Sequence, residues 1–137
     1  MYLLDTNIIS EPLKKIPRIS FLRRLRSHSV EDLYIASISV MELRYGAIRK
    51  KDNGRLWKRI EQELVNCYNI LDFKQEEASC AGDILADLSR FGIMIEVEDA
   101  MIAATALSHN LILVTGNEKH FRRIPRLKIE NWLRDDA

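Results

Sequence analysis

Cysteine, proline and glycine are scarce in this chain of 137 residues, which contains 2, 3 and 5 of them, respectively. Cys67 and Cys80 stand in no CxxC or similar spacing, so the sequence supports neither a disulfide framework nor a zinc site. Both are expected to be small hydrophobic residues of the core. The low proline and glycine counts predict that regular helices and strands make up most of the chain.

Long apolar runs and targeting signals are absent as well. No stretch of the sequence approaches the roughly 18 consecutive apolar residues that a membrane-spanning helix requires. Residues 1–5 lack the basic region and the apolar core of a secretory signal peptide. We therefore expect a cytoplasmic protein.

The net charge of +1 conceals a strong asymmetry along the chain. Residues 1–60 contain 13 Lys and Arg against 6 Asp and Glu, whereas residues 61–115 contain 2 against 10. A basic segment of this kind is typical of proteins that bind an anionic partner such as nucleic acid, but solvated helix faces produce it too. The content of 47% hydrophobic and 30% charged residues excludes a disordered chain and predicts one folded domain over residues 1–137.

Short apolar runs alternate with segments of helical periodicity. The runs predict strands at residues 2–4, 33–36, 70–73, 111–114 and 127–129. Helical spacing predicts helices at residues 6–15, 17–26, 39–48, 56–67, 75–91 and 99–109, with Pro17 and Ser39 opening two of them. This alternation indicates an α/β fold with a mostly parallel central sheet of about four to five short strands, flanked by helices.

Polar residues that could carry chemistry stand where the carboxyl ends of the strands are expected, which is where parallel sheets bind ligands. Asp5 ends the first strand, and Glu42 lies one turn into the helix after the second. Asp99 opens the helix before the fourth strand, and Asn117 follows that strand. Clustered carboxylates repel one another unless a cation neutralises them, and oxygen ligands suit Mg²⁺ or Mn²⁺. Such a site is suited to metal-assisted hydrolysis of phosphodiesters.

Each of these residues also has a purely structural interpretation. Asp5 could cap the following helix, and Glu42 stands three residues after Ser39, which is the spacing of a capping box. Asp99 would favour the positive N-terminal end of its helix, and Asn117 suits a turn. Spacing alone leaves both interpretations open.

Four segments carry a recognisable pattern in order along the chain: LLDTN at residues 3–7, SISVMELRYG at residues 37–46, DAMIAATA at residues 99–106 and LVTGNEKHF at residues 113–121. Ile-Pro at residues 124–125 and Glu-Asn-Trp at residues 130–132 follow. The pattern resembles the PIN-domain ribonucleases, specifically the small VapC- and FitB-like toxins of bacterial type II toxin–antitoxin systems.

The resemblance implies a Mg²⁺-dependent endoribonuclease, with Mn²⁺ as an alternative ion. By position, Asp5, Glu42 and Asp99 are the expected catalytic and metal-binding acids. The residues expected to support them are Thr6, Asn7, Thr115 and Asn117. The family often has a fourth acid in the closing turn, but neither Asn117 nor His120 is acidic. The resemblance also implies an RNA substrate, a cognate antitoxin that neutralises the protein, and a homodimer.

Two other classes of function stay open at the level of sequence. A phosphoacceptor signalling domain also has acids at strand ends, although it requires an acidic pair after its first strand. A catalytically inactive PIN-like module would bind a protein partner without metal. The remaining expectations are that His28, His109 and His120 are surface residues and that Trp57 and Trp132 belong to the core or an interface. Gly46 is either a glycine tolerated inside its helix or one that permits close packing of another helix.

Overall fold

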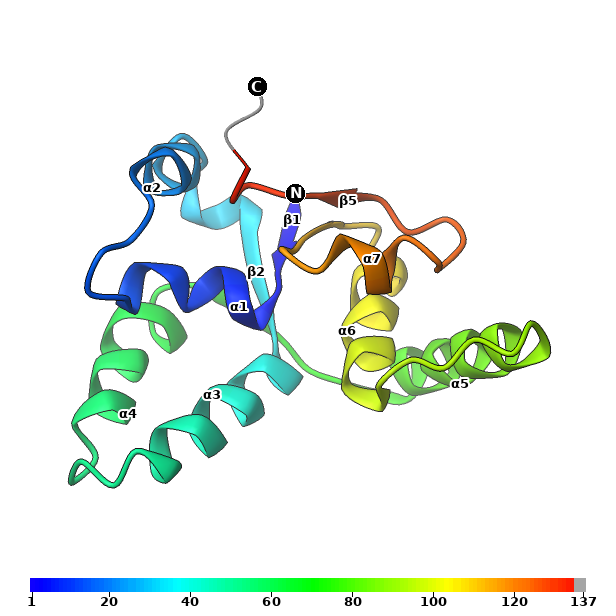
Figure 1. Cartoon of the computed structure of the whole chain (residues 1–137), viewed down its shortest axis with the longest axis horizontal. Helices are drawn as coiled ribbons and strands as arrows, with labels where there is room; N and C mark the ends of the chain where they lie inside the picture. The colour runs from blue at the N-terminus through cyan, green and yellow to red at the C-terminus, as the bar shows by residue number, and fades with distance from the viewer. Residues whose placement is uncertain (135–137) are drawn as a thin grey trace.

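The computed structural model describes residues 1–134, and its centre is one sheet of five parallel strands in the order β3–β2–β1–β4–β5 (Figure 1). The strands are β1 (Tyr2–Leu4), β2 (Leu33–Ala36), β3 (Asn69–Leu71), β4 (Ile112–Val114) and β5 (Ile129–Glu130). The predicted α/β class is therefore confirmed. The order also places the carboxyl ends of β1, β2 and β4 next to one another.

Each face of the sheet supports its own hydrophobic core, because successive residues of a strand point to opposite faces. In β1, Leu3 packs in one cluster and Leu4 in the other. In β4, Leu113 and Val114 divide between the same two clusters. A sheet covered on both faces explains why its central strands are continuous apolar runs.

The N-terminal half of the chain covers one face of the sheet (Figure 1). Its elements are α1 (Thr6–Ile9), the 3-10 helix η1 (Glu11–Leu13), α2 (Ile19–Arg26), the 3-10 helix η2 (Val30–Asp32), α3 (Ser37–Arg49), α4 (Arg55–Ile60) and the π-helix η3 (Glu61–Val65). The α-helix α2 begins after Arg18, so the prediction of Pro17 as a first helical residue is wrong by two positions.

The opposite face is covered by α5 (Gln75–Arg90) and α6 (Val97–Ser108), and the short α7 (Glu118–Phe121) follows β4. The alanines of α6 are completely buried, as expected for a helix that is apolar on nearly all sides. Gly92, with φ of 69°, follows the end of α5 at the predicted position. No helix within residues 1–134 is both long and apolar enough to cross a membrane.

The predicted burial of the cysteines is wrong for Cys67, which is exposed, while Cys80 is half-buried. Cys67 follows η3, whose π-helical turns are wider than the α-helical turns that the spacing assumed. Leu64 within η3 is buried, but three residues later the chain faces solvent. The prediction for Trp132 is confirmed, because its side chain is buried against Tyr2 and stacks on His28.

Candidate functional site

The site begins where β1 and β4 end side by side. Leu4 and Val114 are paired in the parallel register, so the residues that follow them, Asp5 and Thr115, are neighbours across the sheet. The backbone N–H of Asp5 continues the ladder by donating to Val114 O at 2.9 Å. Sheet pairing therefore places the Asp5 carboxyl group and the Thr115 hydroxyl together without help from any helix.

The Asp5 side chain is buried, with 5% of its surface exposed. Its Oδ1 accepts from the backbone N–H of Thr6 at 2.8 Å, and its Oδ2 accepts from Thr115 Oγ1 at 2.8 Å. Burial raises the pKa of Asp5 to about 6, and the charges of Asp99 and Glu42 add to the rise, against the lowering by these two hydrogen bonds. Asp5 thus caps α1 and also lies within electrostatic reach of both other predicted acids.

Glu42 does not belong to a capping box. The helix α3 begins at Ser37 after an N-cap at Ala36 that makes no side-chain hydrogen bond, so Ser39 and Glu42 are both inside the helix. Thr6 Oγ1 lies 2.7 Å from Glu42 Oε1 and 2.8 Å from Ser39 Oγ. Because a carboxylate only accepts and one hydroxyl carries one proton, Thr6 donates to Glu42 and Ser39 donates to Thr6.

Ser39 is a member of the site that sequence reasoning missed. Its side chain is fully buried, and the hydroxyl chain from Ser39 through Thr6 orients the Glu42 carboxylate. The sequence signal was the three-residue spacing between Ser39 and Glu42, which puts both side chains on one face of a helix. The same spacing also fits a capping box, and the sequence left that alternative open.

Asp99 lies in the first turn of α6, where a negative charge is favourable, so its structural interpretation and its place in the site are compatible. His120 Nδ1 is 3.5 Å from Asp99 Oδ2 and 2.9 Å from Asn117 Nδ2. The description of His120 as a surface residue is therefore incomplete: 48% of its side chain is exposed, yet it contacts two residues of the site. The signal was its position three residues after Asn117, on the same side of a helical turn.

The predicted supporting residues divide into those that contact the acids and those that do not. Thr6 and Thr115 each hydrogen bond to an acid. Asn117 acts one step away, since its backbone N–H donates to Thr115 Oγ1 at 2.9 Å. Asn7 is exposed on α1, and within residues 1–134 its side chain makes no hydrogen bond. The carboxylate of Glu118 points elsewhere and accepts hydrogen bonds from Asn131, Arg122 and Arg134.

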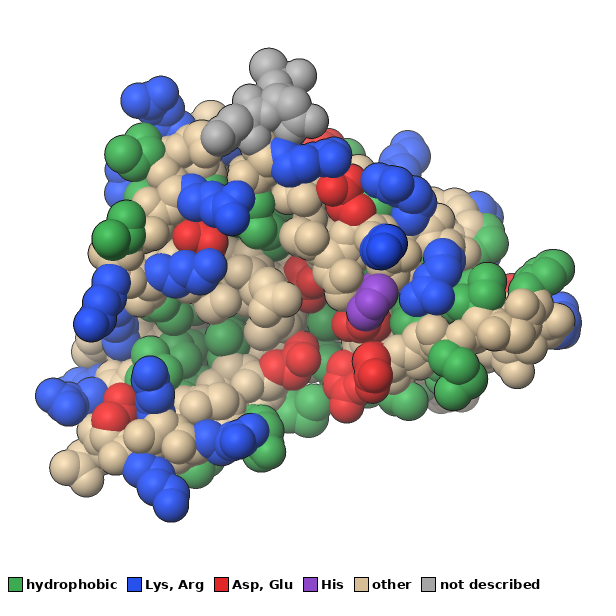
Figure 2. Space-filling model, in the orientation of Figure 1, with side chains coloured by type: hydrophobic (Ala, Val, Ile, Leu, Met, Phe, Trp, Pro, Cys, Tyr) green, Lys and Arg blue, Asp and Glu red, His purple; other side chains and the backbone are tan. Residues whose placement is uncertain are grey.

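Lys and Arg side chains of residues 1–134 do not neutralise the acids of the site. Among the described residues no Lys or Arg forms an ion pair with Asp5, Glu42 or Asp99. Figure 2 shows acidic side chains gathered at the centre of this face, between α3 and α6, with basic side chains around them. Each carboxylate is held by its own protein partner, and in residues 1–134 no three potential ligands are arranged to hold a metal ion. As a donor set, however, unneutralised carboxylate oxygens fit a hard divalent cation.

Comparison with known proteins connects this geometry to a family. A family model described as PIN domain matches residues 2–127. The chain is 37% identical over 132 residues to Ribonuclease VapC2 of Haemophilus influenzae, covering 96% of this chain and 98% of that protein. It superposes on the FitAcB structure from Neisseria gonorrhoeae with a TM-score of 0.87 at 34% identity, covering 97% and 99% of the two chains. A toxin-antitoxin complex from Klebsiella pneumoniae is also similar, with a TM-score of 0.73, 26% identity and coverage of 96% and 98%.

Proposed function

This chain belongs to the PIN-domain family, and from that membership and the acidic site we propose that it is a Mg²⁺-dependent endoribonuclease toxin neutralised by a cognate antitoxin. The observation that carries the proposal is the convergence of Asp5, Glu42 and Asp99: the charges of Glu42 and Asp99 act on Asp5, and no Lys or Arg within residues 1–134 pairs with any of the three. Family membership gives no support to the phosphoacceptor alternative. Activity separates the proposal from an inactive PIN-like module.

In this proposal, Asp5, Glu42 and Asp99 hold the metal, and the other groups of the site orient these three. Thr115 and the backbone of Thr6 fix the two oxygens of Asp5, and the Thr6 hydroxyl fixes Glu42. When bound, Mg²⁺ or Mn²⁺ would activate a water molecule and stabilise the leaving oxygen of the phosphodiester. These hydrogen bonds orient Asp5 and Glu42. Because the three acids are not arranged around one point within residues 1–134, they have to approach one another when the ion binds.

RNA is the proposed substrate because its phosphates complement the surroundings of the acidic centre. Figure 2 shows Lys and Arg side chains on both sides of that centre, over α2 to α4 and over the region of α7. Basic groups at these positions can neutralise the phosphates that flank the cut, while the acids and their metal act on the phosphate between them.

The proposed antitoxin site is a groove of about 390 Å³ between α1, α3 and α4. Its lining includes apolar Leu13, Leu43 and Leu56, and Glu42 is part of it. A Cβ atom added at Gly46 would meet nothing within 4 Å, so no helix within residues 1–134 fills the space that the glycine leaves open. A partner helix could lie there and place an Arg against the unneutralised acids, because guanidinium binds carboxylates in a bidentate manner.

A second copy of the chain is the proposed occupant of another face of α3. Met41, Tyr45 and Ile48 are each more than half exposed and follow one another at helical spacing. Three large apolar side chains in one stripe are typical of a protein interface rather than of scattered surface residues. In light scattering, we expect the wild type to have the mass of a dimer and the Tyr45→Glu variant to have the mass of a monomer.

Cleavage by purified protein tests the proposed function. We expect single-stranded RNA to be cut with Mg²⁺, to stay intact with EDTA, and to be cut again when Mg²⁺ is restored. In calorimetry, Mg²⁺ should bind the wild type but not Asp5→Asn. Expression of the chain alone should arrest growth, and co-expression with its antitoxin should restore growth. A chain that binds a partner but neither Mg²⁺ nor RNA would be the inactive module, and labelling of Asp5 by acetyl phosphate would identify a phosphoacceptor.

Glu42→Gln distinguishes the metal role of this residue from a purely structural one. Gln retains an oxygen that accepts from Thr6, so we expect little change in stability. Because the substitution removes one of the negative charges of the site, we expect cleavage to fall by roughly tenfold or more, as on loss of an oriented group at a metal site. If Glu42→Gln cleaves RNA at the rate of the wild type, the role of Glu42 is only structural. Glu63→Gln, on the exposed part of η3, is the matched control.

A further inference from the structure

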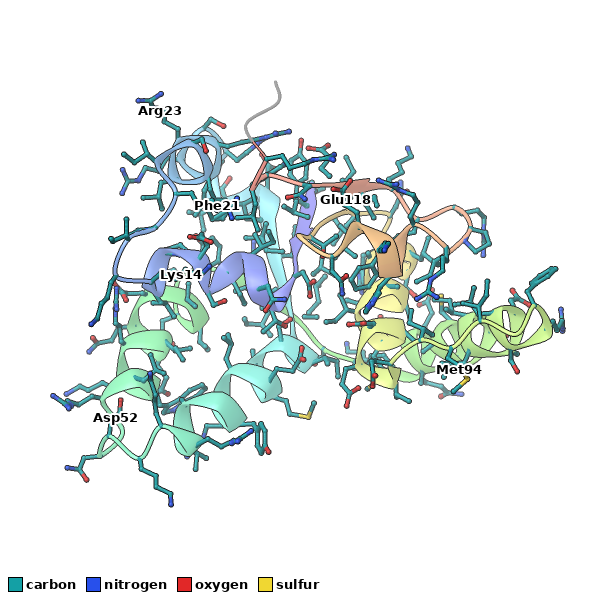
Figure 3. All side chains as sticks on the ribbon, in the orientation of Figure 1. Lys14, Phe21, Arg23, Asp52, Met94 and Glu118 are labelled. Carbon is teal, nitrogen blue, oxygen red and sulfur yellow. The ribbon has the colours of Figure 1, made fainter. Side chains whose placement is uncertain are left out.

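A second cavity adjoins the acidic site on the side of α7. It has a volume of about 440 Å³ and lies between α7 and the segment that leads into α6. The residues that line it are Met94, Ile95, Glu96, Val97, His120 and Arg123. Figure 3 shows Met94 on the segment between α5 and α6. This volume falls in the range of roughly 300–1,000 Å³ that is usual for small-molecule sites.

Two residues of the lining lie next to the acidic site. His120 lines the cavity and also lies 3.5 Å from Asp99 Oδ2. Val97 lines it from the first turn of α6, two residues before Asp99. A group seated in the cavity is therefore next to whatever is bound at the acids.

The walls of the cavity have the chemistry of a site for a planar ring. His120 offers an imidazole ring that Asn117 orients, and Arg123 offers a guanidinium plane; both surfaces stack on nucleobases. Met94, Ile95 and Val97 form the apolar part of the lining. Of these, Met94 and Val97 are 86% and 55% exposed, so they are available for contact.

The acidic lining residue, Glu96, decides which part of a nucleotide can enter. Its carboxylate only accepts hydrogen bonds and is negatively charged, so it repels a phosphate. The amino and imino groups of a base are donors that a carboxylate can bind. A base therefore fits the cavity, while the attached phosphates stay outside, within reach of Arg123.

We propose that this cavity holds an unpaired base of the nucleotide beside the phosphate that is cut, between His120 and Arg123 on one side and Met94 and Val97 on the other. The inference rests on the proposed ribonuclease function. Because a base inside a duplex is stacked and paired, only RNA with a free base at that position can use the site. The cavity thereby selects for single-stranded or looped RNA.

Removal of the base and removal of the side chain, separately and together, test this inference. The probe is a fluorescein-labelled single-stranded RNA whose cut position has been mapped with the wild type. Two further RNAs carry one abasic residue each, one on the 5′ side of the cut and the other on the 3′ side. Affinity is measured by anisotropy with Ca²⁺ in place of Mg²⁺. We expect the base-free RNA to bind the wild type at least roughly fivefold more weakly at one of the two positions, the low end for one stacked base.

The variants His120→Ala and Arg123→Ala should bind the intact RNA as weakly as the wild type binds the base-free RNA, and they should not distinguish the two. His120→Phe should restore the distinction, because it keeps a ring to stack on but loses the imidazole nitrogens near Asp99. Arg90→Ala removes the same charge from an exposed position at the end of α5 and should behave as the wild type.

Three results would overturn the inference. Equal affinity of the wild type for intact and abasic RNA would show that no base is held. Full discrimination by both alanine variants would place the base elsewhere. Failure of His120→Phe to restore discrimination would show that His120 acts through Asp99 rather than by stacking. In all three cases the proposed ribonuclease function would still stand, provided that the wild type cleaves RNA. If the wild type cleaves no RNA, the proposed function itself is wrong.

Discussion

The floor of the site, Asp5 and Thr115, differs from its rim, Asp99, Asn117 and His120, in what holds it in place. The floor is buried and is positioned by sheet register, backbone N–H groups and a hydroxyl. The rim is more exposed, with 20% of the Asp99 side chain and 48% of the His120 side chain accessible. Its three residues are held to one another by side-chain contacts. The floor is therefore part of the folded core, whereas the rim can adjust to a bound substrate.

The strongest test of the floor is Asp5→Asn. Asn has almost the same shape but no charge, so we expect RNA cleavage to fall by roughly a hundredfold or more, the scale of losing one charged group at a reacting centre. The fold should persist, because Asn can still accept from the backbone N–H of Thr6. Cleavage assays beside thermal unfolding measure both. Activity within a few-fold of the wild type would mean that the floor is structural only.

The same residue makes stability depend on pH in an unusual direction. The pKa of Asp5 is raised from 3.8 to about 6, so between these values the folded state keeps a proton that the unfolded state has lost. Without metal, this contribution to stability is complete below pH 3.8 and disappears as pH rises through 6, on the order of 2–3 kcal/mol in all. We expect Asp5→Asn to gain stability relative to the wild type between pH 4 and pH 7 in denaturant titrations with EDTA.

Other carboxyl groups act in the opposite direction, so the comparison with Asp5→Asn is needed. The pKa of Glu118 is lowered, chiefly by the hydrogen bond from Asn131, and its contribution is present above its usual value of 4.5 and is lost as pH falls. The wild type and Asp5→Asn share the contribution of Glu118, so it cancels when their free energies of unfolding are subtracted. A difference in stability that does not change with pH would contradict the assignment of the raised pKa to Asp5.

Thr115→Val tests the hydroxyl that connects the two strand ends. The substitution leaves Asp5 Oδ2 and the backbone N–H of Asn117 without their partner, so we expect a loss of about 1–3 kcal/mol in the free energy of unfolding. Thr105→Val is the matched control, because Thr105 is equally buried but bonds only within its own helix, to Met101 O. Equal losses in the two variants would show that the effect comes from packing.

Asn117→Ala should have the smallest effect, because it touches only the rim. Its side chain orients His120 at an exposed position, so we expect the free energy of unfolding to change by less than about 0.5 kcal/mol. Cleavage should fall only a few-fold, since the His120 ring loses its orientation but no acid is removed. A loss as large as that of Asp5→Asn would erase the distinction between floor and rim.

Much of this architecture follows from local patterns in the sequence. The short apolar runs predicted all five strands to within two residues, because a strand buried on both faces has to be continuously apolar. Asp5 was predicted at the site because it directly follows such a run. The boundaries of the helices were less certain, as Pro17 and Ser39 show, since several residues in a row are compatible with a helix start.

Local sequence patterns predict the α/β alternation, the two-sided sheet and the placement of acids at strand ends, because each depends on residues close together along the chain. Packing in three dimensions is needed to see that Ser39 and Thr6 orient Glu42, that His120 reaches Asp99, and that Cys67 faces solvent. These contacts join residues from different elements or depend on how a helix is wound. Periodicity assigns a side chain to a face of its own element, but packing between elements decides what that side chain meets.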